Sequence, residues 1–209
     1  MVRRAVVVLV GPVEWVPPGI DPVHWRTALV EDVVDLLAMV EQAEPAIAVT
    51  APDRELAERV AWPMMPIHQL PDRTVNAALA AVAADGYDQA AVIAADAPDL
   101  PGLVLGKLLR PLTSKPVAVA PAAAVGGDPR TGSGLLGLAT RLPVPDWLPE
   151  VDLDRTDQAT VRAAAPHPGA VAVTPAWRRL RGPGELATLD PAVAGWDATR
   201  LLLSPSPHS

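Results

Sequence analysis

The sequence predicts a single α/β domain, with a mostly parallel open sheet and helices on both faces. Three observations predict this class. Several short runs consist only of apolar, mainly β-branched residues, as in strands buried on both faces. Segments with helical spacing of apolar residues separate these runs across residues 1–120. The connections between them are short, as in an open sheet covered by helices.

The first strand is predicted at residues 5–10, where Ala-Val-Val-Val-Leu-Val ends at Gly11-Pro12. A continuous apolar run bounded by Gly and Pro is typical of a central parallel strand. Further apolar strands are predicted at residues 46–50, 90–94, 116–120 and 170–174. Pro63, Pro66 and Pro71 predict an irregular stretch, within which residues 65–69 are the candidate for a brief strand.

Apolar residues recur at helical spacing between the strands, and the predicted helices cover residues 25–41, 53–60, 72–84 and 103–112. The first helix is expected to start at Asp21 or Pro22, and Asp85-Gly86 to end the third.

After Gly126 the pattern changes. A Gly-rich loop at 126–134, an apolar run at 135–138 and many prolines predict an irregular region over the carboxyl edge of the sheet. Helical turns are expected at 184–189 and 192–202. We expect one domain over residues 1–203 and a disordered tail at 204–209.

Composition excludes several classes of protein. Cysteine is absent, which rules out disulfides and thiolate chemistry. The net charge of −7 argues against a nucleic-acid binder. No apolar run reaches the ~18 residues of a membrane span. We therefore expect a cytoplasmic protein whose partner is neither nucleic acid nor membrane, and the sequence leaves homo-oligomerisation open.

The segment Ala91-Val-Ile-Ala-Ala-Asp96-Ala-Pro-Asp99-Leu-Pro101 carries the clearest functional signal. Open α/β sheets bind ligands beyond the carboxyl ends of their strands, and Asp96 comes two residues after a wholly apolar strand. A carboxylate there could hold a divalent cation and, through it, phosphates. The alternative is that Asp96 or Asp99 caps the following turn or helix.

Residues 72–101 resemble the same region of the GT-A-like nucleotidyltransferases, especially the 2-phospho-lactate and molybdenum-cofactor guanylyltransferases. The segment around Asp96 also resembles the V-I-I-G-x-D-x-P-D-L pattern of a bacterial family of nucleotide-diphospho-sugar glycosyltransferases, with one residue fewer before the aspartate. Thr74-Val-Asn76-Ala-Ala-Leu79 is similar to the G-L-N-x-A-L element of the guanylyltransferases. The resemblance implies a nucleotide or phosphorylated ligand, Mg²⁺ or Mn²⁺ at Asp96, a catalytic role for Asp96 and Asp99, and ligand contact by Asn76.

Two motifs of that superfamily differ here. The relatives have a basic loop after the first strand, whereas residues 11–22 contain no basic residue and include Glu14 and Asp21. The relatives also have a D-V-D-T-P-E-D-L-A-x-L element, and Arg179 and Arg181 replace its two metal-binding aspartates. Guanidinium groups at these positions disfavour Mg²⁺ or Mn²⁺ and favour a phosphate or carboxylate.

The Gly-rich loop resembles a third element over the substrate site of these relatives. Glycine backbone can approach a phosphate closely and point N–H groups at it. An ordinary surface loop is the equal alternative. The candidate ligand contacts in this loop are Gly126, Gly127, Arg130, Thr131 and Ser133, to which Arg179 and Arg181 are added.

Asp152, Asp154 and Asp157 form an acidic run that could replace the missing metal ligands, although such runs are more often solvated loops and helix caps. Three functions remain. The first is a nucleotide- or nucleotide-sugar-binding transferase, acting as a nucleotidyltransferase or glycosyltransferase. The second is a catalytically inactive homologue that keeps the fold for binding or assembly. The third is an enzyme that acts on a small phosphorylated substrate through arginines alone.

Overall fold

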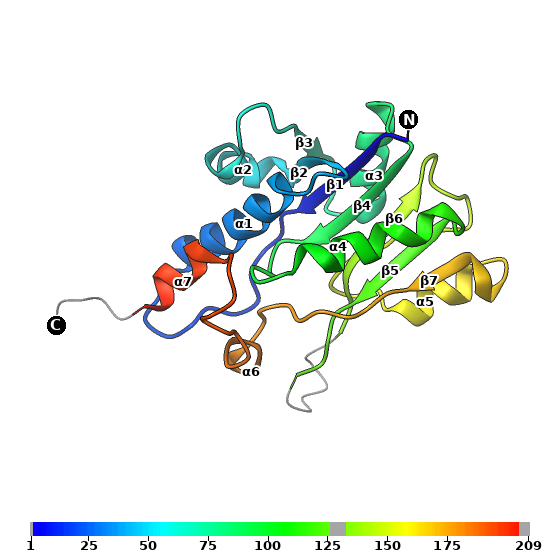
Figure 1. The fold of residues 1–209 in the computed structure, drawn as a ribbon. Helices are drawn as coiled ribbons and strands as arrows, with labels where there is room; N and C mark the ends of the chain where they lie inside the picture. The colour runs from blue at the N-terminus through cyan, green and yellow to red at the C-terminus, as the bar shows by residue number, and fades with distance from the viewer. Residues whose placement is uncertain (1, 126–132, 205–209) are drawn as a thin grey trace.

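The computed structural model describes residues 2–125 and 133–204. Its strands form one mixed sheet in the order β3-β2-β1-β4-β6-β5-β7 (Figure 1). The strands are β1 (Arg4–Leu9), β2 (Glu44–Thr50), β3 (Ile67–Leu70), β4 (Gln89–Ala94), β5 (Val117–Pro121), β6 (Leu135–Arg141) and β7 (Val171–Val173). The helices are α1 (Pro22–Ala38), α2 (Arg54–Val60), α3 (Val75–Ala84), α4 (Gly102–Leu109), α5 (Gln158–Ala164), α6 (Pro183–Leu186) and α7 (Asp197–Leu203).

The predicted α/β class and mostly parallel sheet are confirmed. Strands β3, β2, β1 and β4 are parallel neighbours, and β5 pairs in parallel with β7. The apolar runs form these strands because both of their faces are covered by helices, so alternate side chains are buried on opposite sides. The structure thus agrees with the sequence at every predicted strand.

Side chains cap the first and third helices at their amino ends. The Asp21 carboxylate accepts hydrogen bonds from the backbone N–H groups of Val23 and His24, and Pro22 follows it as the first helical residue. The Thr74 hydroxyl accepts from the N–H of Ala77. The first helix ends at Ala38, three residues before the predicted end.

Residues 135–141 form a strand that was not predicted from the sequence. The run at 135–138 was expected to be irregular, but it begins β6, which lies antiparallel between β4 and β5. Gly137 allows this close fit, since a Cβ there would lie 2.8 Å from the carbonyl oxygen of Val92. A segment that comes after β5 in the chain therefore lies between β4 and β5 and joins them into one sheet.

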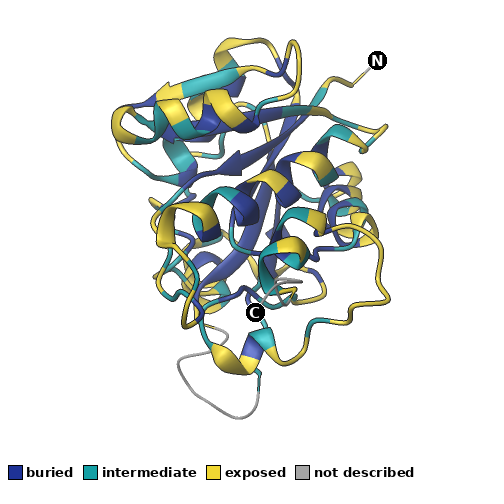
Figure 2. Ribbon diagram, turned by 90° about the vertical axis from the view of Figure 1, so that its left-hand side faces the viewer, coloured by how far each residue is buried: buried dark blue, intermediate teal, exposed yellow. Residues whose placement is uncertain are grey.

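Two apolar layers enclose the sheet, and Figure 2 shows its strands as a buried band between more exposed helices. Helices α1, α2 and α4 bury one layer, which includes Val33, Leu37 and Leu108. Helices α3 and α5 bury the other, which includes Leu79 and Val161. Each fully buried aliphatic side chain contributes roughly 1.5–3 kcal/mol, so these layers hold the carboxyl ends of the strands in fixed positions.

Helix α7 packs along α1, as Figure 1 shows. Asp32 of α1, which is 4% exposed, accepts hydrogen bonds from the N–H groups of Ala198 and Thr199 at 2.9 and 2.8 Å. Burial raises the pKa of this carboxyl, and the bonds to Thr199 and Ala198 partly offset that rise. The carboxylate thus caps a helix 166 residues away in sequence.

Within residues 2–125 and 133–204, no helix is long and apolar enough to cross a membrane. The domain predicted over residues 1–203 includes every helix and strand described. Residues 205–209 of the expected tail lie outside the described residues.

Candidate functional site

Asp96 lies beyond the carboxyl end of β4, beside the carboxyl end of β1. The chain runs from β1 outward to β2 and β3, and then returns to place β4 on the other side of β1. The order of the strands therefore reverses between β1 and β4, which is where open α/β sheets bind ligands. The predicted position of Asp96 agrees with the structure.

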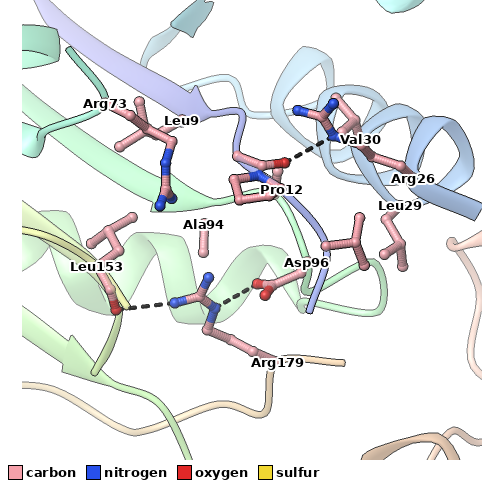
Figure 3. Close-up of a pocket in the computed structure, with 13 residues that line it drawn as sticks. Leu9, Pro12, Arg26, Leu29, Val30, Arg73, Ala94, Asp96, Leu153 and Arg179 are labelled. Atoms are coloured by element: carbon pink, nitrogen blue, oxygen red, sulfur yellow. Dashed lines mark hydrogen bonds and ion pairs between the residues drawn. The ribbon is translucent and has the colours of Figure 1, made fainter. Parts of the chain in front are cut away.

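Two arginines contact the Asp96 carboxylate, and Figure 3 shows one of them, Arg179. Nε of Arg179 donates to Oδ1 at 2.5 Å, and Nε of Arg181 lies 3.4 Å from Oδ2. The backbone also fixes this approach, because the N–H of Leu180 donates to the carbonyl of Asp96 at 2.7 Å. The segment that replaces the metal-binding element of the resembled superfamily therefore lies directly on Asp96.

Asp154 completes the cluster from the loop before α5. Its Oδ1 accepts from Nη2 of Arg179 at 2.8 Å and from Nη2 of Arg181 at 2.7 Å, and its Oδ2 accepts from Nη1 of Arg73 at 2.8 Å. Asp96 and Asp154 thus share two guanidinium groups. We call Asp96, Asp154, Arg73, Arg179 and Arg181 the arginine–aspartate cluster.

Arg179 is the most completely bonded member of the cluster. Its side chain is 7% exposed, and Nη1 donates to the carbonyls of Leu135 and Leu153 at 3.1 and 3.0 Å. Burial would lower the pKa of Arg179, but the carboxylates of Asp96 and Asp154 outweigh burial and raise it. Arg179 therefore stays charged although it is almost sealed from solvent.

Burial and neighbouring charges also act in opposite directions on the pKa of Asp154. Burial would raise the pKa of its carboxyl, but the charge of Arg179, the hydrogen bond from Arg73 and the charge of Arg181 hold the pKa below its ordinary value. The carboxylate is consequently ionised at neutral pH, and its charge is bound by arginines of the same chain.

Asp99 lies apart from this cluster. Its carboxylate pairs with the guanidinium of Arg178 and accepts from Nε1 of Trp177 at 3.3 Å. Burial raises the pKa of Asp99, and the Arg178 charge offsets part of that rise. Pro101 is the N-cap residue of α4 and offers no capping side chain. The carboxylates of Asp96 and Asp99 bond instead to side chains within residues 177–181.

The loop after β1 acquires positive charge from other elements. Arg26 of α1 donates from Nε to the carbonyl of Gly11 at 2.9 Å and pairs with Asp53 at 2.7 Å. Arg73, in the loop before α3, lies against Gly11. Arg73 was not predicted as a site residue. Its signal was present, because Arg73 follows the third strand and therefore comes out at the carboxyl edge of the sheet.

These side chains line a small pocket at the switch point, drawn in Figure 3. The lining includes Arg26, Arg73, Arg179 and Asp96, together with the loop at 11–13 and the apolar Leu9, Leu29 and Val30. The pocket measures about 20 Å³, enough for roughly one water molecule. The lining side chains therefore leave little free space between them.

Asn76 is directed elsewhere. Its Nδ2 donates to the carbonyl of Pro149 at 3.1 Å, and its Oδ1 accepts from the N–H of Val151 at 2.8 Å. It ties α3 to residues 149–151 and is not among the residues that line the pocket. Ser133 meets the cluster through its carbonyl, which accepts from Nη1 of Arg181 at 3.1 Å. The predicted contacts at Gly126, Gly127, Arg130 and Thr131 lie outside the described residues.

The donor set does not fit a divalent cation. Both oxygens of Asp96 and both of Asp154 already accept from guanidinium groups. Asp152 and Asp157 do not join them: Asp152 bonds to the N–H of Asp154, and Asp157 caps α5. Among the described residues, no three His, Asp or Glu side chains are grouped to hold a metal.

Comparison with solved structures supports the fold. A protein assigned as a nucleotide-diphospho-sugar transferase, from Desulfovibrio desulfuricans G20, aligns over 97% of this chain and 95% of its own, with a TM-score of 0.66 and 18% identity. A 4-diphosphocytidyl-2C-methyl-D-erythritol synthase from Anaerococcus prevotii aligns over 83% and 86%, with a TM-score of 0.53 and 10% identity.

A CMP:2-keto-3-deoxy-manno-octonic acid synthetase in complex with CTP aligns over 88% of this chain and 94% of its own, with a TM-score of 0.53 and 14% identity. No protein-family model and no curated protein sequence matches the chain. The chain thus has the fold of the nucleotide-diphospho-sugar transferases, with the low identity of a divergent example. At such identities the likeness describes the fold and not the reaction.

Proposed function

We propose that this protein binds a nucleotide or another phosphorylated small molecule beyond the carboxyl ends of β1 and β4, without metal-dependent transfer. The charge of the pocket carries the proposal. The described lining includes three arginines and one aspartate. With Arg181 and the carboxylates of Asp53 and Asp154 that pair with these arginines, the group keeps one net positive charge in a chain whose net charge is −7. Guanidinium groups recognise phosphate through paired charge-assisted hydrogen bonds.

Arg73 and Arg26 are the lining arginines best placed to meet such a ligand. Their side chains are 28% and 26% exposed, whereas those of Arg179 and Arg181 are each 7% exposed. A nucleotide is far larger than a pocket of about 20 Å³. Binding therefore places only a phosphate at the mouth of the pocket, beside Arg73, with the rest of the ligand outside.

The arginine–aspartate cluster supports a non-catalytic role. Metal-assisted phosphoryl transfer needs carboxylates that are available to a cation, and the described carboxylates at this edge are bound by arginines. The functional class that fits this arrangement is thus a transferase-fold binding protein. An active nucleotidyltransferase or glycosyltransferase of the GT-A type is the competing outcome of the experiment.

Thermal-shift measurements with GTP, CTP, UDP-sugars and pyrophosphate, each in EDTA and in Mg²⁺, test the proposal. We expect a phosphate-bearing ligand to stabilise the protein equally in both media. A ligand present at 100 times its dissociation constant stabilises by about 2.7 kcal/mol, which such an assay detects.

Two variants make the result specific. Arg73→Ala should remove the shift, whereas Arg155→Ala should keep it, because the Arg155 side chain is 89% exposed and lies outside the pocket. Absence of any shift across the ligands would overturn binding. Magnesium-dependent turnover of a nucleotide would overturn the non-catalytic role.

A further inference from the structure

The acceptors around Arg179 are all oxygen atoms of the chain itself. Its guanidinium donates to four oxygens: the carboxylates of Asp96 and Asp154, and the backbone carbonyls of Leu135 and Leu153. Carboxylates and carbonyls are also the ligands that Ca²⁺ and Mg²⁺ take in proteins. The positively charged guanidinium of Arg179 is thus surrounded by oxygen atoms of the chain, as a bound metal ion would be.

These oxygens come from separate parts of the chain. Asp96 follows β4, Leu135 begins β6, and Leu153 and Asp154 belong to the loop before α5. Each of these segments is joined to Arg179 by at least one hydrogen bond. The guanidinium therefore holds the carboxyl edge of the sheet together, as a bound ion would hold its ligands.

Removal of the guanidinium would leave the two carboxylates close together. Nε and Nη2 belong to one planar group, and they contact Asp96 and Asp154 at 2.5 and 2.8 Å. Arg181 would still contact both carboxylates and Arg73 would still contact Asp154, but the pair would lose its most buried counter-charge. Two buried carboxylates with less counter-charge repel each other more strongly and are costlier to keep ionised. A divalent cation at the same point would relieve that cost.

We propose that Arg179 is a built-in cation that occupies a divalent-ion position between Asp96 and Asp154 and closes that position to metal ions in the native protein. Arg181 contributes a second guanidinium to the same two carboxylates. The inference concerns the cation of the cluster and does not depend on nucleotide binding.

The experiment compares wild-type protein with Arg179→Ala by thermal denaturation in EDTA, Ca²⁺ and Mn²⁺, with calorimetric titration of each ion. Ca²⁺ is the primary probe because it accepts flexible oxygen shells, whereas Mg²⁺ demands strict octahedral geometry. Wild-type protein should show no calorimetric binding and the same melting temperature in all three media. In EDTA, the variant should melt roughly 10 °C lower.

Ca²⁺ or Mn²⁺ should reverse at least half of the decrease in melting temperature that Arg179→Ala causes. Guanidinium ion at a low, non-denaturing concentration should rescue it as well, while K⁺ at equal ionic strength should not. Adding Asp96→Asn to the variant should abolish the rescue by Ca²⁺. Recovery of the melting temperature both with guanidinium ion and with Ca²⁺ or Mn²⁺ would identify the empty position as a cation site.

Several results would overturn the inference. One is calorimetric binding of Ca²⁺ or Mn²⁺ to wild-type protein that Asp96→Asn removes. Another is an Arg179→Ala protein that is as stable as wild type. A third is an Arg179→Ala protein whose melting temperature rises neither with guanidinium ion nor with Ca²⁺ or Mn²⁺. If Arg179→Ala does not fold, Arg179→Lys takes its place. A Lys ammonium keeps the charge but has fewer donors, so the melting temperature of this variant should lie below that of wild type and be the same in EDTA and in Ca²⁺; a melting temperature equal to that of wild type would overturn the inference.

Discussion

The guanidinium of Arg73 lies on the backbone of Gly11, where a Cβ at residue 11 would be 2.6 Å from Nη1. The side chain covers the loop that follows β1 and reaches Asp154 with the same nitrogen. Positive charge that is missing from the sequence of this loop is thus supplied by a residue 62 positions later.

Gly11→Ala tests the importance of this contact. The added methyl group would displace the far end of a flexible side chain, so the free energy of unfolding should change by less than about 1 kcal/mol. Affinity for pyrophosphate or a nucleotide should fall several-fold, because Arg73 would leave its place. Chemical denaturation and a binding titration measure the two quantities. Gly184→Ala, whose Cβ would meet no atom within 4 Å, is the matched control and should retain affinity.

Stability at acid pH should depend on Asp154. Its pKa is lower in the folded protein, so its contribution is complete above the ordinary value of about 3.9 and is lost as the pH falls through the folded value. Asp154→Asn should therefore be less stable at neutral pH, and its difference from wild type should shrink in acid. Urea denaturation from about pH 7 to pH 3 measures this difference.

The exposed Glu41→Gln is the control for that measurement and should follow wild type throughout. A stability difference between Asp154→Asn and wild type that stays constant in acid would contradict the assigned cause.

Asn76→Ala should lower the free energy of unfolding by about 1–3 kcal/mol, because it leaves the carbonyl of Pro149 and the N–H of Val151 without their side-chain partner. Hydrogen exchange at the amide of Val151 should accelerate. Gln42→Ala, which removes an exposed amide, should change neither quantity. Loss of ligand affinity in Asn76→Ala with full stability would instead support the ligand contact expected from the sequence.

Gly137→Ala tests the antiparallel insertion of β6. Its Cβ would lie 2.8 Å from the carbonyl of Val92 and 2.9 Å from Cγ2 of Ile93, so the sheet would have to shift. We expect a loss of roughly 1–3 kcal/mol, as for other overpacked cores. Gly106→Ala in α4, with no atom within 4 Å, should instead gain about 0.5–1 kcal/mol. Equal effects of the two substitutions on thermal unfolding would contradict the packing described.

The central strands could be predicted because their residues are apolar on both faces, and short runs of this kind that end at Gly or Pro are typical of buried parallel strands. Strand β6 could not be predicted from its apolar run. The run is short, it contains Gly137, and it follows a Gly-rich loop. Its antiparallel position between β4 and β5 depends on pairing with both strands, which no local pattern records.

The candidate site was predictable in part. The position of Asp96 followed from the strand before it, and Arg179 and Arg181 were expected near it from the resemblance. The sequence analysis assigned these arginines to an external phosphate or carboxylate, while the structure gives them two carboxylates of the chain itself. Contacts between residues 83 and 25 positions apart follow from the tertiary structure alone.

The place of β6 in the sheet has a consequence for how the chain is made. On a ribosome, β4 and β5 emerge before residues 135–141, yet they meet only through them. Until then, one edge of the wholly buried β4 stays unpaired and can join another chain. A nascent or truncated chain that stops before residue 135 should therefore aggregate, and the yield of native protein should depend on how fast that last central strand arrives.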